Sequence, residues 1–164
     1  MRSAKLIIPD AGPLFSFAAI GELNLLFELG IPVFLTDYIE WKTTRSETST
    51  ANRIAHWIAD NSERVTVIET EAGADRIRKE KANIHDKRKN VGQLSIFEVI
   101  SNDYIAPGPY IFLFEDEKMQ QKAGMTYFDH YPVRLTSIYG FLVALERRGK
   151  ITNADQVFSQ MRGV

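Results

Sequence analysis

The chain has 164 residues, of which 45% are hydrophobic and 25% are charged, as expected of one globular domain and unlike a disordered chain. Its 20 basic and 21 acidic residues give a formal net charge of −1, which excludes a polybasic protein and confines any nucleic-acid contact to a local patch. The lack of cysteine excludes disulfides, thiol catalysis and cysteine-ligated metal sites.

Hydropathy gives no sign of membrane insertion. No apolar run approaches the roughly 18 residues that a membrane span needs. The apolar run that follows Lys5 ends before Asp10 and is too short for the hydrophobic region of a secretory signal. We therefore expect a cytoplasmic protein that makes no membrane contact.

The chain begins with an apolar run followed by helix-start residues. Residues 5–9 read as a buried strand that ends at Pro9. Asp10 stands where it can cap the following helix. Apolar residues then recur at helical spacing over 14–29, interrupted at Gly21, which predicts two short helices rather than one.

The middle of the chain continues the alternation of strands and helices. The apolar and capping patterns predict a strand over 33–35, a helix from Thr36 or Asp37 to about Thr43, a helix over 51–59 and a strand over 65–68. The mostly charged residues 71–90 fit either an exposed helix or a mobile loop.

The last third holds the clearest strand. Residues 91–100 are apolar over most of a helical surface, which predicts a helix wedged between layers. The run 110–114 predicts a buried strand, residues 136–148 a helix, and Asn153 the cap of a last short helix. Strands that alternate with helices indicate an α/β sandwich with a mostly parallel sheet.

Acidic residues follow two of the predicted strands. Asp10 comes after the first strand, and Glu115 and Asp116 come after the strand at 110–114. Ligands bind at the carboxyl ends of strands in such sheets, and clustered carboxylates there favour Mg²⁺ or Mn²⁺. Such an ion can activate water against a phosphodiester. The alternative is that these acids only cap helices or complement their dipoles.

Four segments, in this order, resemble blocks of PIN domains. The first segment is a strand that ends in Asp before a small residue and Gly-Pro-Leu, and the second is a helix start similar to Gly-Glu-x-x-Ala-Ile. The third is an apolar strand followed by acidic residues, and the fourth is a C-terminal helix that ends in a string similar to Arg-Arg-Gly-Lys-Ile. The segments are Ile8–Leu14 with Ala19–Leu26, then Val91–Ile96, Ile111–Lys118 and Gly140–Ile151.

The resemblance implies both a fold and an activity. PIN domains are three-layer α/β/α sandwiches with a mostly parallel central sheet, and the resemblance implies one such domain over 1–164. They are metal-dependent ribonucleases, and many are VapC-type toxins of toxin–antitoxin systems. The expected function is therefore a Mg²⁺- or Mn²⁺-dependent endoribonuclease that cleaves RNA, pairs with an antitoxin protein and forms a homodimer.

The family's acidic positions map unevenly onto this chain. The resemblance implies that Asp10 is the first acid and Asp116 the last, with Glu115 as the alternative one residue away. For the second acid, one register gives Glu40 and another gives Lys42, and the two differ by about 200° around a helix. Glu40 also follows Asp37 at the spacing of a capping box.

The third acidic position departs from the family. Gln93 stands where the family has Glu, and its neutral amide donates an oxygen but no charge. The expected catalytic residues are Asp10, Glu40 and Asp116, and the expected metal ligands are Asp10, Asp116, Glu115 and Gln93. The alternative function is a catalytically impaired PIN-like module that binds RNA or a protein.

A basic segment gives the expected RNA contacts. Residues 76–89 hold seven basic side chains and two acidic ones, a composition that suits phosphate binding beside an acidic cleft. The alternative is an ordinary solvated surface. The predicted RNA-binding residues are Arg76, Arg78, Lys79, Lys87, Arg88 and Lys89.

Overall fold

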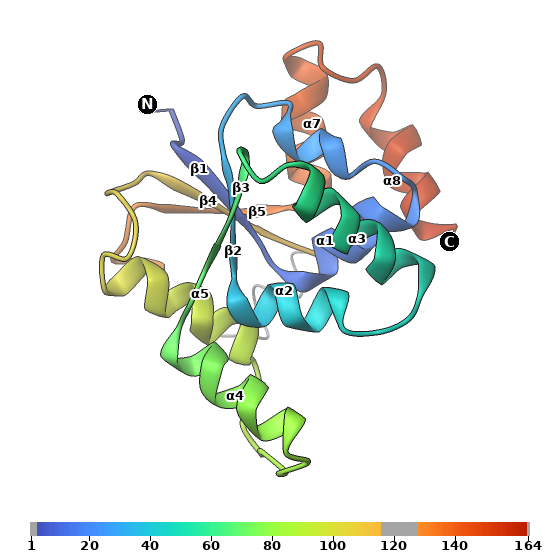
Figure 1. Ribbon diagram of the computed structural model, residues 1–164. Helices are drawn as coiled ribbons and strands as arrows, with labels where there is room; N and C mark the ends of the chain where they lie inside the picture. The colour runs from blue at the N-terminus through green and yellow to red at the C-terminus, as the bar shows by residue number, and fades with distance from the viewer. Residues whose placement is uncertain (1–2, 116–127, 164) are drawn as a thin grey trace.

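A computed structural model describes residues 3–115 and 128–163 of the protein (Figure 1). Its sheet has five strands in the order β3-β2-β1-β4-β5, and every neighbouring pair is parallel. The strands are β1 (Leu6–Pro9), β2 (Val33–Thr36), β3 (Val65–Ile68), β4 (Tyr110–Phe114) and β5 (Val133–Ser137).

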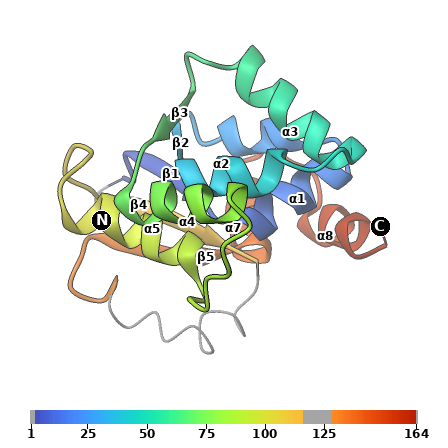
Figure 2. The same cartoon turned by 60° about the horizontal axis from the view of Figure 1, so that its bottom comes forward.

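Helices cover both faces of this sheet. The four helices α1, α3, α7 and α8 lie on one side and α5 on the other (Figure 1). Figure 2 brings α4 forward and shows it beside α2 and α5. The predicted three-layer α/β/α sandwich is confirmed. The helices are α1 (Ala11–Ala19), α2 (Asp37–Thr44), α3 (Ser49–Asp60), α4 (Glu71–Lys81), α5 (Val91–Ser101), α7 (Ile138–Arg147) and α8 (Ala154–Arg162), with a 3-10 helix η1 (Leu23–Phe27).

The two central strands, β1 and β4, are buried along their whole length, as expected where helices cover both faces of a parallel sheet. On one face, the Phe112 ring lies 5.3 Å from the ring of Phe128, which in turn lies 5.8 Å from Phe97 of α5. On the other, Phe17 of α1 meets Phe141 of α7 edge to face. Apolar layers therefore cover both faces of β1 and β4, whose parallel pairing sets their register.

The structure corrects two of the predicted details. Residues 136 and 137, expected to begin a helix, end strand β5, and Ser137 caps α7. This strand is at the edge of the sheet and only partly buried, so its sequence lacks the apolar run of a central strand. The cap of α2 is Thr36, whose hydroxyl accepts from the Ile39 N–H, so the capping box predicted for Asp37 and Glu40 is wrong.

The charged stretch after β3 forms a helix followed by an irregular connection. Residues 71–81 form α4, and residues 83–90 connect it to α5 without forming a helix or strand. The pair predicted before Gly30 is α1 followed by the shorter η1. Within residues 3–115 and 128–163, no helix is long and apolar enough to cross a membrane.

Candidate functional site

The sheet order places a topological switch point between β1 and β4. The chain leaves β1 toward β2 on one side, whereas β4 adds on the other side, and ligands bind where the strand order reverses in this way. Pro9 is in register with Leu113, and the Asp10 N–H donates to the Leu113 carbonyl at 2.8 Å. Asp10 and Glu115 therefore leave adjacent strands at the same edge.

Glycine at position 12 makes room for the second of these acids. A Cβ atom there would lie 2.8 Å from Glu115 Oε2, a separation that real Cβ contacts do not reach. Glu115 thus lies against the first turn of α1, the helix that Asp10 caps. The two carboxylates come from positions 105 residues apart in the sequence but border one space.

That space is a pocket of about 450 Å³. Its walls come from the start of α1, one side of α2, α4, the connection before α5, the first turn of α5 and the end of β4. The residues that line it are Asp10, Ala11, Gly12, Phe15, Tyr38, Lys42, Arg76, Arg88, Lys89, Asn90, Val91, Gly92, Gln93 and Glu115.

Asp10 is the most buried charge of the pocket, with 7% of its surface exposed. Its Oδ1 accepts the Ala11 N–H at 2.8 Å. Burial raises the pKa of this carboxyl, while the Ala11 N–H, the positive charge of Lys42 and a hydrogen bond from Gln93 lower it. A carboxylate in this position needs a cation beside it, because desolvation penalises its charge.

Gln93 lies next to Asp10 and is 5% exposed. Its Oε1 atom is buried and has no hydrogen-bond partner among the described residues. Buried polar atoms nearly always have a partner, and an unsatisfied one costs about 1–3 kcal/mol. This orphaned oxygen is the clearest sign in the pocket of a group that binds there.

Lys42, rather than Glu40, faces the pocket. Lys42 is in the lining and its charge acts on Asp10, whereas Glu40 is not among the described lining residues. Burial, followed by the negative charge of Asp37, raises the pKa of Glu40. The structure thus decides between the two predicted registers of this helix, and it adopts the register that places Lys42 beside Asp10.

The predicted RNA-binding residues divide between two locations. Three of them, Arg76, Arg88 and Lys89, line the pocket. Arg78 and Lys79 instead form ion pairs with Asp75 on the same helix. The remaining one, Lys87, is exposed in the connection between α4 and α5, outside the described lining. Asp116, the last predicted acid, lies outside the described residues.

Sequence reasoning missed two polar residues of the lining, Tyr38 and Asn90. Tyr38 precedes Lys42 by four residues on α2, so the register that brings Lys42 to the pocket brings Tyr38 as well. Asn90 has a left-handed backbone (φ 61°) and ends the connection before α5 without a side-chain capping bond. Only the helix register and this turn, rather than any motif, identify them.

The oxygen atoms of Asp10, Glu115 and Gln93 suit Mg²⁺ or Mn²⁺ in type. The charge of the lining opposes such an ion, since Lys42, Arg76, Arg88 and Lys89 also border the pocket. Within the part of the chain that the structure describes, no three His, Asp or Glu side chains cluster closely enough to form a metal site. Among the described residues, the ligand types therefore fit a divalent cation, whereas the positive side chains of the lining oppose one.

Comparison with known proteins adds no family to this picture. No protein-family model matches the chain, and no curated protein matches it significantly. The resemblance to PIN domains stays a prediction.

Proposed function

We propose that this pocket binds single-stranded RNA through its phosphates, and that the protein is a PIN-like module whose metal-dependent catalysis is impaired. The observation that carries the proposal is the side chain of Lys42, which borders the pocket beside Asp10. A divalent cation would need a carboxylate at that place, whereas a phosphate needs a cation.

The charge of the pocket supports binding of an anion. Its described lining has four cationic side chains, Lys42, Arg76, Arg88 and Lys89, against the two carboxylates Asp10 and Glu115. Contacts from such side chains to phosphates supply most of the affinity of proteins for nucleic acids. Phe15 in the same lining provides an aromatic ring, and unpaired bases stack on such rings.

The proposal is tested by adding the protein to a labelled single-stranded RNA in the presence of EDTA and measuring the fluorescence anisotropy of the RNA. We expect binding without divalent metal, and we expect Lys42→Glu to weaken it by about tenfold because a phosphate contact becomes a repulsion. Lys150→Glu makes the same charge change at an exposed position after α7 and serves as the control. No binding by the wild type, or equal losses in both variants, would refute the proposal.

Metal-dependent RNA hydrolysis is a second candidate, favoured by the unpartnered Gln93 Oε1 beside Asp10. Asp10, Glu115 and Gln93 would hold Mg²⁺ or Mn²⁺, which when bound supplies an activated water and offsets charge on the phosphodiester. A toxin role, with an antitoxin partner, would depend on this activity.

The Asp10→Asn variant separates the two candidates. Asparagine caps a helix as well as aspartate does, so α1 is retained. A hydrolase loses Mn²⁺-dependent RNA cleavage in this variant, whereas a binding module keeps its affinity for RNA or gains some, because a negative charge leaves the pocket. Equal cleavage by both proteins would indicate a contaminating nuclease and remove the enzyme candidate.

A further inference from the structure

The connection of residues 83–90 supplies part of the pocket without belonging to a helix or strand. It begins and ends with left-handed asparagines, Asn83 and Asn90. Arg88, Lys89 and Asn90 from this connection line the pocket. A segment without regular structure needs side-chain contacts to present such residues in a fixed position.

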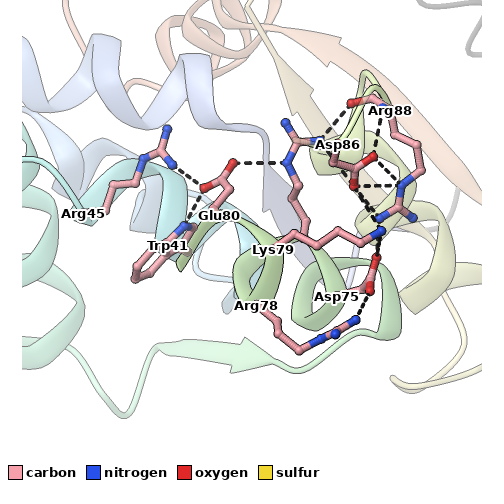
Figure 3. A network of polar contacts seen from close by, with 9 residues as sticks. Trp41, Arg45, Asp75, Arg78, Lys79, Glu80, Asp86 and Arg88 are labelled. Atoms are coloured by element: carbon pink, nitrogen blue, oxygen red, sulfur yellow. Dashed lines mark hydrogen bonds and ion pairs between the residues drawn. The ribbon is translucent and has the colours of Figure 1, made fainter. Parts of the chain in front are cut away.

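Two aspartates provide these contacts (Figure 3). Asp86 accepts from the Arg88 backbone N–H at 3.0 Å and from Arg88 Nε at 3.0 Å. Asp75 of α4 accepts from Arg88 Nη2 at 2.5 Å. Hydrogen bonds from the Arg88 side chain and backbone hold the pKa of Asp86 well below its usual range.

Further cations of α4 close the cluster. Lys79 Nζ lies 3.0 Å from Asp75 Oδ2 and 3.7 Å from Asp86 Oδ2. Arg76 Nη1 donates to the Arg88 carbonyl at 2.8 Å. Isolated surface ion pairs contribute little, but charges joined in a network fix geometry more firmly. The connection is thereby fastened to α4 by both its backbone and its side chains.

The same contacts divide the basic segment into two kinds of residue. Arg78, Lys79 and Arg88 each have a carboxylate partner in this cluster. Lys89 has no ion pair among the described residues, and it borders the pocket. Among the described residues of this connection, Lys89 is the one that both borders the pocket and has no ion pair, so its ammonium group can contact a phosphate there.

We infer that Asp75 and Asp86 are positioning residues for RNA binding, which hold the connection of residues 83–90 so that Lys89 reaches a phosphate in the pocket. The inference rests on the proposed function. The expected change in RNA affinity on loss of Asp86 is opposite to the usual one. Loss of an acidic group ordinarily strengthens nucleic-acid binding, because net charge becomes more positive, whereas loss of Asp86 should weaken it here.

The test compares Asp86→Asn with Asp60→Asn, which makes the same charge change at the exposed end of α3. We expect Asp86→Asn to weaken RNA binding by about threefold or more, because a phosphate contact is lost. Asp60→Asn should leave RNA binding unchanged or slightly stronger. Lys89→Ala should weaken binding as Asp86→Asn does, and Arg78→Ala should not. Tighter binding by Asp86→Asn would overturn the inference.

Hydrogen exchange of the full-length protein gives a readout that does not depend on RNA. In Asp86→Asn, amides of residues 83–90 should exchange faster while those of β1 and β4 keep the wild-type rate, which also shows that the variant is folded. Unchanged exchange at 83–90 would overturn the positioning role. Wild-type protein that fails to bind RNA would refute the proposed function, whereas normal RNA binding by Asp86→Asn would refute this inference alone.

Discussion

The salt dependence of RNA binding measures how many cations of the pocket meet phosphates. For single-stranded nucleic acid, the logarithm of the binding constant falls against the logarithm of salt concentration with a slope of about −0.7 per neutralised phosphate. Four cationic side chains line the described pocket. If all four engaged phosphates, the slope would be about −2.8.

The ion pairs of the structure predict a smaller value. Arg76 is paired with Glu80, and Arg88 is paired with Asp75 and Asp86. Among the described residues, Lys42 and Lys89 are then the two remaining cations of the lining, which gives a slope of about −1.4. Over a fourfold rise in salt, the affinity should fall by about sevenfold rather than by about fiftyfold.

Anisotropy titrations at several salt concentrations test this count. Lys89→Ala should make the slope shallower by about 0.7, the share of one phosphate. Arg78→Ala, which removes a cation outside the described lining, should leave the slope unchanged. A wild-type slope near −2.8 would refute the division between paired and available cations, and a slope near zero would refute phosphate binding altogether.

Three further predictions concern stability and are measured by urea denaturation. Burial raises the pKa of Asp10, so the contribution of this carboxyl to the free energy of unfolding falls as pH rises through its folded-state pKa. Asp10→Asn should therefore stabilise the fold at pH 7. This gain in the free energy of unfolding should shrink toward pH 3.8, the ordinary pKa of the group. Gly73→Ala would place Cβ 2.0 Å from Asp37 Oδ1 and should cost about 2 kcal/mol, whereas Gly140→Ala, 3.3 Å from its nearest neighbour, should cost far less. Phe112→Ala, fully buried, should cost about 3–5 kcal/mol.

The fold was predictable wherever burial marks the sequence on its own. The run 110–114 is apolar throughout because β4 is covered on both faces, and Asn153 was identified as a cap from its residue type alone. The edge strand β5 was missed because partial burial leaves Arg134 and Thr136 within it. Such a strand is defined by its pairing with β4, which no local pattern encodes.

The candidate site was predictable as far as strand ends fix positions. Asp10 and Glu115 follow β1 and β4 directly, so the parallel sheet alone brings them to one edge. The choice between Glu40 and Lys42 depended on the rotation of α2, which is set by the buried face of that helix, Ile39 and Thr43. The ion-pair partners of the basic residues could not be predicted either, because a count of charges in the sequence does not show which charges pair.

The burial of Asp10 is the fact that any function of this pocket has to explain. A desolvated carboxylate is costly unless a positive charge lies close by, and Lys42 lies where its charge acts on Asp10. A divalent cation and the Lys42 ammonium would compete for this role, because each repels the other. With the lysine already present in the protein, a divalent cation gains little from Asp10, while Lys89, which has no ion pair among the described residues, remains for a phosphate.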